Sequence, residues 1–223
     1  MAEVPNRSSL QPFAPRLPEP LSPTCHEAVH PRDEWQNERI EGDLSAQVAD
    51  HVEMTGCELH GVRCTGARLE VLRLVDVLAV DSELSGAVVT ESSLQRVEFA
   101  NCRMSGMVMS DSKLRSVRFR DCKLDDANFR FVKAERVVFD GCSLVNADFT
   151  AAAFTSSAFA GCNLRTAEFS KASLKGTRFA GSVLDGLRGA SSLRGAVIAS
   201  DQVLPLALGV FSDMGISISD ERE

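Results

Sequence analysis

The sequence repeats every five residues from Met54 to Leu184. Stepping through this segment in fives gives 27 positions, of which 11 are leucine and 9 are phenylalanine. The residue two places before each of them is always small or apolar, and none of these 54 positions carries a charge. Two inward residues in every five match neither the 3.6-residue period of a helix nor the alternation of a simple strand. The segment is therefore an internal repeat, and it predicts a solenoid.

Residue type also recurs at an interval of twenty. If four groups of five make one turn of a coil, residues twenty apart lie directly above one another at about 4.8 Å, the spacing between strands. The sequence then predicts core columns of identical side chains that run along the coil. These columns are Phe99, Phe119, Phe139, Phe159 and Phe179; Phe129, Phe149 and Phe169; and Cys102, Cys122, Cys142 and Cys162.

The cysteine column is predicted to be structural. Stacked Cβ atoms about 4.8 Å apart exceed the roughly 3.5–4.5 Å that a disulfide requires. A straight column of sulfurs also cannot surround a zinc ion tetrahedrally. We therefore expect four buried, protonated thiols that act as small apolar fillers.

Several five-residue units resemble the A-(D/N)-L-x-x pattern of the pentapeptide-repeat family. They read ANFRF at 127–131, ADFTA at 147–151, CNLRT at 162–166 and AEFSK at 167–171. The resemblance covers about residues 44–198. It implies an all-β solenoid, namely a right-handed quadrilateral β-helix of about seven turns with a short C-terminal helix.

The chain divides into three parts. Residues 1–38 are rich in proline and lack an apolar period, so this segment is expected to be disordered or extended. Residues 39–199 form the predicted coil, in which the register slips by one residue after Leu184. Residues 200–223 are expected to cover its C-terminal end.

A short amphipathic helix is predicted in the last part. Its apolar stripe is formed by three residues at positions i, i+4 and i+7, and it begins near Val203 because Pro205 is tolerated only in a first helical turn. The family resemblance implies that such an element either caps the coil or pairs two subunits, and a homodimer is favoured. The stripe consists of Leu204, Leu208 and Phe211.

The sequence predicts no enzyme and no cofactor, catalytic or metal site. Tyrosine is absent, and all four histidines lie at or before residue 60, outside most of the repeat. No run of about 18 apolar residues indicates a membrane span. Seven cysteines without an export signal favour reduced thiols and a cytoplasmic protein.

The predicted function is that of a scaffold for an unidentified protein partner. The resemblance implies an alternative, because some bacterial members of the family imitate duplex DNA, bind DNA gyrase and protect it from quinolones or toxins. A duplex mimic needs a dense negative surface, yet residues 51–187 contain 17 acidic and 17 basic side chains. This balance favours the scaffold.

One face of the predicted coil is mildly basic. It is a candidate contact for an acidic protein or a nucleic-acid backbone, and the alternative is an ordinary solvated surface. Its cationic residues are Arg73, Arg96, Lys113, Arg115, Lys133, Arg136 and Lys175.

Overall fold

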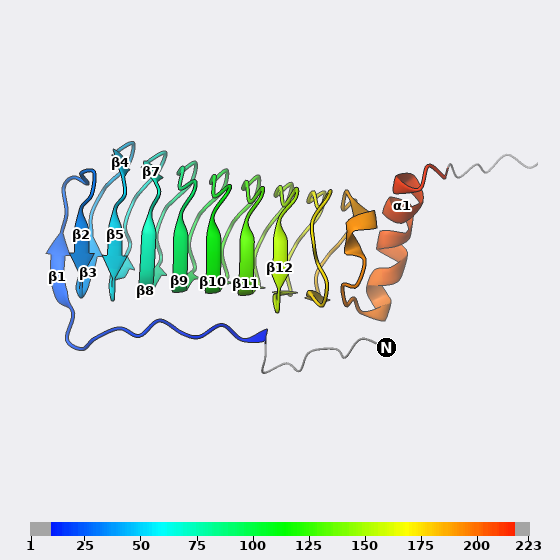
Figure 1. The fold of residues 1–223 in the computed structure, drawn as a ribbon, viewed down its shortest axis with the longest axis horizontal. Coiled ribbons are helices and arrows are strands. Elements are labelled where there is room, and N and C mark those ends of the chain that lie inside the picture. Colours follow the sequence, from blue (N-terminus) through cyan, green and yellow to red (C-terminus); the bar gives the residue numbers. More distant parts are fainter. Residues whose placement is uncertain (1–9, 217–223) are drawn as a thin grey trace, which may run out of the picture.

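The five-residue repeat folds into a four-sided parallel β-solenoid of about eight turns (Figure 1). The computed structural model describes residues 10–216. The predicted first and last parts of the chain therefore lie partly outside the described residues. One helix follows the coil and covers its C-terminal end (Figure 1).

The strands are short and follow one another around the coil. They are β1 (Ser22–Cys25), β2 (Glu34–Gln36), β3 (Glu38–Glu41), β4 (Val48–Asp50), β5 (Glu53–Thr55), β6 (Glu58–His60), β7 (Arg68–Glu70), β8 (Arg73–Val80), β9 (Ser93–Ala100), β10 (Lys113–Arg120), β11 (Lys133–Asp140), β12 (Ala153–Thr155), β13 (Ala158–Ala160) and β14 (Arg178–Ala180). Two 3₁₀ turns, Ala190–Leu193 and Ser200–Gln202, lead into helix α1 (Val203–Asp213).

The strand register confirms that one turn contains twenty residues. Strands β9, β10 and β11 pair in parallel so that Phe99, Phe119 and Phe139 are direct neighbours. The same interval relates Asn163 to Val183 near the end of the repeat. An unbroken interval stacks equivalent side chains along the coil, which explains why residue type recurs at twenty.

Two phenylalanine columns fill the C-terminal half of the core. Within a column the rings stack in parallel, with centroids 4.8 Å apart between Phe119 and Phe139 and 4.9 Å apart between Phe139 and Phe159. Between columns the rings meet edge to face, as Phe129 and Phe139 do at 5.7 Å. Both arrangements are favoured by the ring quadrupole. The core is therefore dense and almost wholly apolar.

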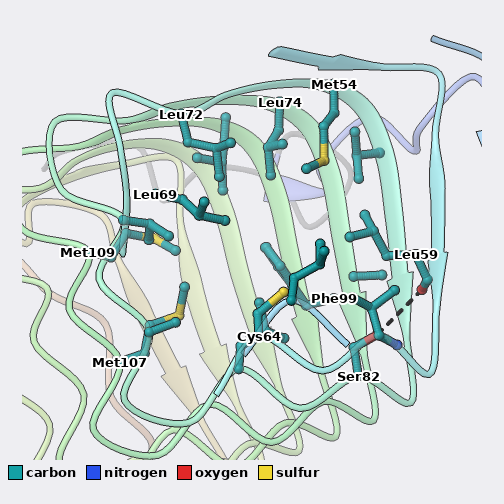
Figure 2. A pocket seen from close by; sticks show the side chains of 18 residues that line it. Met54, Leu59, Cys64, Leu69, Leu72, Leu74, Ser82, Phe99, Met107 and Met109 are labelled. Atoms are coloured by element: carbon teal, nitrogen blue, oxygen red, sulfur yellow. Dashed lines mark hydrogen bonds between the residues drawn. The ribbon is translucent and has the colours of Figure 1, made fainter. Parts of the chain in front are cut away.

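The N-terminal half of the core is packed differently. Ala79 and Val89 occupy the positions that continue the two phenylalanine columns toward the N-terminus, but their smaller side chains do not fill the space of a phenylalanine ring. Flexible methionines, including Met107 and Met109, occupy part of the space, and an apolar cavity of about 40 Å³ remains (Figure 2). A space of this size has room for little more than one water molecule. It is a gap in the packing of the core, lined mainly by apolar side chains.

The coil begins earlier than residue 39. Trp35 in β2 pairs with Met54 in β5, and β1 adds a further strand beside β3. The interval from Trp35 to Met54 is nineteen residues rather than twenty, so the repeat of five does not reveal this first turn. Residues ahead of the predicted coil therefore cover its N-terminal end.

Helix α1 closes the other end of the coil. Its Leu206 is buried, and Val210 packs against the core. Just before the helix, the buried side chain of Gln202 donates a hydrogen bond from Nε2 to the carbonyl oxygen of Ser182, at 2.6 Å.

The expected one-residue slip in the repeat register is present, because Arg178 pairs with Val197 at an interval of nineteen. Within residues 10–216, no helix has the length and apolar character of a membrane span.

Candidate interaction surfaces

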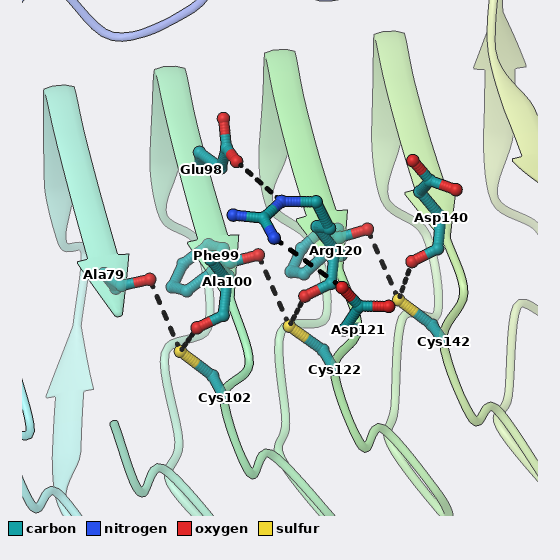
Figure 3. A network of polar contacts seen from close by, with 11 residues as sticks. Ala79, Glu98, Phe99, Ala100, Cys102, Arg120, Asp121, Cys122, Asp140 and Cys142 are labelled. Atoms are coloured by element: carbon teal, nitrogen blue, oxygen red, sulfur yellow. Dashed lines mark hydrogen bonds and ion pairs between the residues drawn. The ribbon is translucent and has the colours of Figure 1, made fainter. Parts of the chain in front are cut away.

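The cysteine column lies inside the coil and makes weak hydrogen bonds. Each thiol contacts two carbonyl oxygens, one two residues back and one in the preceding turn (Figure 3). For Cys142 these are Asp140 at 3.5 Å and Phe119 at 3.3 Å. Ser82, in the same column, donates to Val80 and Leu59 in the same way.

These thiols are therefore donors as well as fillers. A sulfur that donates to a carbonyl must keep its proton. Elsewhere in the interior, burial raises the pKa of Cys64 to about 12. Among residues 10–216, no group of three or more His, Cys, Asp and Glu side chains is placed to hold a metal ion.

The residues predicted as a basic face fall into two environments. Lys113 and Lys133 are exposed neighbours on β10 and β11, and neither forms an ion pair with the described residues. Arg115 lies beside them and pairs with Glu135 at 3.4 Å. These residues border a groove of about 490 Å³. These two adjacent ammonium groups give the groove a positive potential.

Arg96 and Arg136 occupy a different position, in a column of corner residues that lie twenty apart. We call this set the corner column; each member has a positive φ between 50° and 65° where the coil turns between faces. The corner column consists of Gly56, Asp76, Arg96, Ser116, Arg136 and Ser156. Of the remaining predicted cations, Arg73 pairs with Glu53 at 4.0 Å and Lys175 is exposed.

An extended segment, residues 10–21, runs along the corner column, and we call it the strap. It runs back alongside the coil from β1 (Figure 1). Near its end, a Cβ added to Gly56 would lie 3.3 Å from Cδ of Pro18. Further along, the Arg16 amide donates to Asp76 at 2.9 Å. The guanidinium of Arg136 lies 5.2 Å from the centre of the Phe13 ring.

The strap partly covers the predicted basic face, which sequence reasoning did not foresee. Arg96 makes two hydrogen bonds to Asp76, at 2.6 and 2.5 Å. These bonds hold the pKa of Asp76 below its ordinary value, and the Arg16 amide contributes to the same shift. Asp76 therefore stays ionised at neutral pH and ties the strap to the column. Composition predicted a disordered or extended segment, but nothing in it indicated which residues of the coil it would contact.

The apolar stripe of α1 faces solvent, which corrects one of its two predicted roles. Leu204 is 81% exposed, Leu208 is 65% exposed and Phe211 is 39% exposed. The helix is apolar on both sides, and the side that caps the coil carries Leu206 and Val210 instead. The sequence pattern alone could not distinguish the two sides. Leu204 and Leu208 therefore do not cap the coil, whereas Phe211 lines a pocket together with Ala190 and Leu193 of the coil's last turn.

Comparisons with known proteins identify the same five-residue repeat in this chain. A family model described as pentapeptide repeat region matches residues 50–129, 82–149 and 115–188. No curated protein sequence matches the chain. One similar solved structure is that of HetL, a pentapeptide repeat protein involved in heterocyst differentiation regulation from the cyanobacterium Nostoc sp. strain PCC 7120. HetL is 16% identical to this chain, the match covers 80% of this chain and 90% of HetL, and the TM-score is 0.42.

A second similar structure is full-length QnrB1, described as a plasmid-mediated fluoroquinolone resistance protein. It is 19% identical, the match covers 86% of this chain and 100% of QnrB1, and the TM-score is 0.40.

Proposed function

Because the chain belongs to the pentapeptide repeat family, we propose that it is a non-catalytic scaffold that pairs two coils through α1 and presents their side faces to a protein partner. The observation that supports this most directly is the outer side of α1. Three large apolar side chains, Leu204, Leu208 and Phe211, are exposed there within two turns of one helix. A contiguous exposed apolar patch of this kind is typical of an interaction site.

Dimerisation through α1 would join two coils end to end around a twofold axis. A twofold contact requires a self-complementary patch, and the outer side of a single apolar helix satisfies this requirement. The side faces of both coils would remain free, including the groove next to Lys113 and Lys133. An acidic segment of a partner is the chemistry that this groove favours.

The double substitution Leu204→Glu/Leu208→Glu tests the dimer. The wild-type protein is expected to elute with a mass of about 48 kDa, twice the 24.1 kDa of one chain. The variant is expected to be monomeric, because pairing would bury four carboxylates without partners. Size-exclusion chromatography with light scattering measures both masses.

Val48→Glu is the matched control, because Val48 is 68% exposed in β4, near the opposite end of the coil. It should leave the dimer intact. A wild-type monomer at micromolar concentration, or equal loss of the dimer in both proteins, would refute pairing through α1.

The alternative function is imitation of duplex DNA at DNA gyrase. The coil does not favour it, because cations and anions are mixed along its columns instead of forming one negative surface. One ladder of neighbouring positions runs through Asp43, Arg63, Glu83, Arg103 and Lys123. Asp43 and Arg63 in this ladder also form an ion pair. Such mixing of charges weakens the negative field that a duplex mimic needs.

A gyrase supercoiling assay separates the two functions. With micromolar protein, we expect neither inhibition of supercoiling nor protection from ciprofloxacin. Either effect, if retained after removal of nucleic-acid contaminants, would establish the mimic and displace the scaffold as the primary function.

A further inference from the structure

A cavity of about 260 Å³ lies between the strap and the coil. The strap contributes Phe13 and Arg16 to its lining. The coil contributes Arg96, Arg115 and Ser116, together with Arg136. Four arginines therefore line one space, although they come from four separate points of the chain.

The charges around this cavity are not balanced. Among residues 10–216, only two carboxylates pair with the four arginines: Asp76 pairs with Arg96, and Glu135 pairs with both Arg115 and Arg136. Four cations against two anions leave a net charge of +2. The side chain of Arg16 is within ion-pair distance of no carboxylate among the described residues, although its charge also acts on Asp76. Many guanidinium N–H donors therefore remain for a ligand.

The corner column gives the cavity a defined shape. Arg96 and Arg136 are two turns apart, about 10 Å at the strand spacing, and the small side chain of Ser116 lies between them. The Ser116 hydroxyl oxygen accepts a hydrogen bond from Nε of Arg136 at 3.4 Å, so its own proton is available to a ligand. The result is a notch one residue wide, with a guanidinium on either side.

We propose that this cavity is a binding site for the phosphate group of a small ligand. Guanidinium groups bind phosphate oxygens through paired, charge-assisted hydrogen bonds. A phosphate carries about two negative charges at neutral pH, which matches the surplus of the cavity better than a single carboxylate does. Arg115 and Arg136 bind the phosphate from the coil, Arg16 binds it from the strap, and the Ser116 hydroxyl donates from the floor. This site goes beyond the proposed scaffold function and does not involve α1.

Binding of phosphate has a structural consequence, because half of the site belongs to the strap. A ligand that contacts Arg16 and the coil together holds the strap on the corner column. Trypsin cleavage after Arg16 is therefore expected to slow in the presence of phosphate, whereas cleavage after residues far from the cavity is not.

Titration calorimetry with inorganic phosphate, at ionic strength matched with sodium chloride, tests the site. The wild-type protein should bind one phosphate per chain saturably. The double variant Arg115→Gln/Arg136→Gln should lose about tenfold or more in affinity, since a hydrogen bond to a charged group contributes roughly 1.5–3 kcal/mol. Lys113→Gln/Lys133→Gln is the matched control, because it removes two charges from the same face outside the cavity. The phosphate affinity of the control should stay within about twofold of wild type, because solvent-exposed charges outside the cavity contribute little to binding.

Arg16→Gln provides a second variant that leaves the coil unchanged, so the test does not depend on folding of the double variant. It too should weaken phosphate binding in the calorimetric titration. A third comparison, glycerol 3-phosphate against inorganic phosphate, identifies the source: tighter binding of the ester indicates a monoester ligand, and equal binding indicates free phosphate. Absence of saturable binding, or equal loss in the cavity variant and the lysine control, would overturn the proposal.

Discussion

Replacing Phe139 with alanine is expected to lower the free energy of unfolding by about 3–5 kcal/mol, the range for removing a fully buried phenylalanine. The ring stacks between Phe119 and Phe159 and also meets Phe129 and Phe149 edge to face. Alanine removes all four ring contacts and leaves a cavity in the densest part of the core. Because each turn contacts only its neighbours, the coil cannot close this gap by moving distant elements.

Phe131→Ala is the matched control for this prediction. It makes the same chemical change at an outward position that is 48% exposed, where the ring lies beside the Arg130 guanidinium. Phe131→Ala should lower the free energy of unfolding by no more than about 0.5 kcal/mol, as most surface substitutions do. Guanidinium denaturation followed by circular dichroism measures both. If the two variants shift the midpoint equally, Phe139 does not have the packing role described above.

The repeat was predictable because one physical requirement recurs without interruption. From Met54 to Leu184 every fifth residue must enter the same core, so composition at these positions is restricted in every turn. Residues such as Phe119 and Leu124 therefore reveal both the inward positions and the length of the turn. The slip after Leu184 was visible for the same reason, since it breaks an otherwise unbroken register.

The ends and the strap were not predictable to the same degree, because no repetition specifies them. Trp35 belongs to the first turn, but its interval of nineteen to Met54 hides it. The strap binds through few and dissimilar contacts, such as Phe13 with Arg136, which leave no periodic signal. Helix α1 is apolar on both sides, so the pattern could not show that Leu206 faces the coil and Leu204 faces solvent.

Gly189→Ala is expected to destabilise the C-terminal end of the coil by about 2–5 kcal/mol, through backbone strain and steric overlap together. Gly189 has a φ of 70° at the start of the 3₁₀ turn Ala190–Leu193. A Cβ at this position would lie only 2.6 Å from Cα of Ser170 and 2.8 Å from the carbonyl carbon of Phe169. These are backbone atoms of the preceding turn, so neither can move away as a flexible side chain would.

The damage from Gly189→Ala should be local, because terminal turns of a solenoid can open without the rest. Hydrogen exchange is expected to accelerate in residues 190–213, which include α1, while the central turns around Phe139 stay protected. Gly161→Ala is the control: its φ of 60° is similar, but a Cβ there meets no atom within 4 Å. It should cost only about 1–2 kcal/mol, the cost of a left-handed alanine. Equal exchange in the two variants would show that the close approach to Ser170 does not restrict this position. Since α1 is anchored just beyond Gly189, selective opening should also dissociate the dimer that α1 is proposed to form.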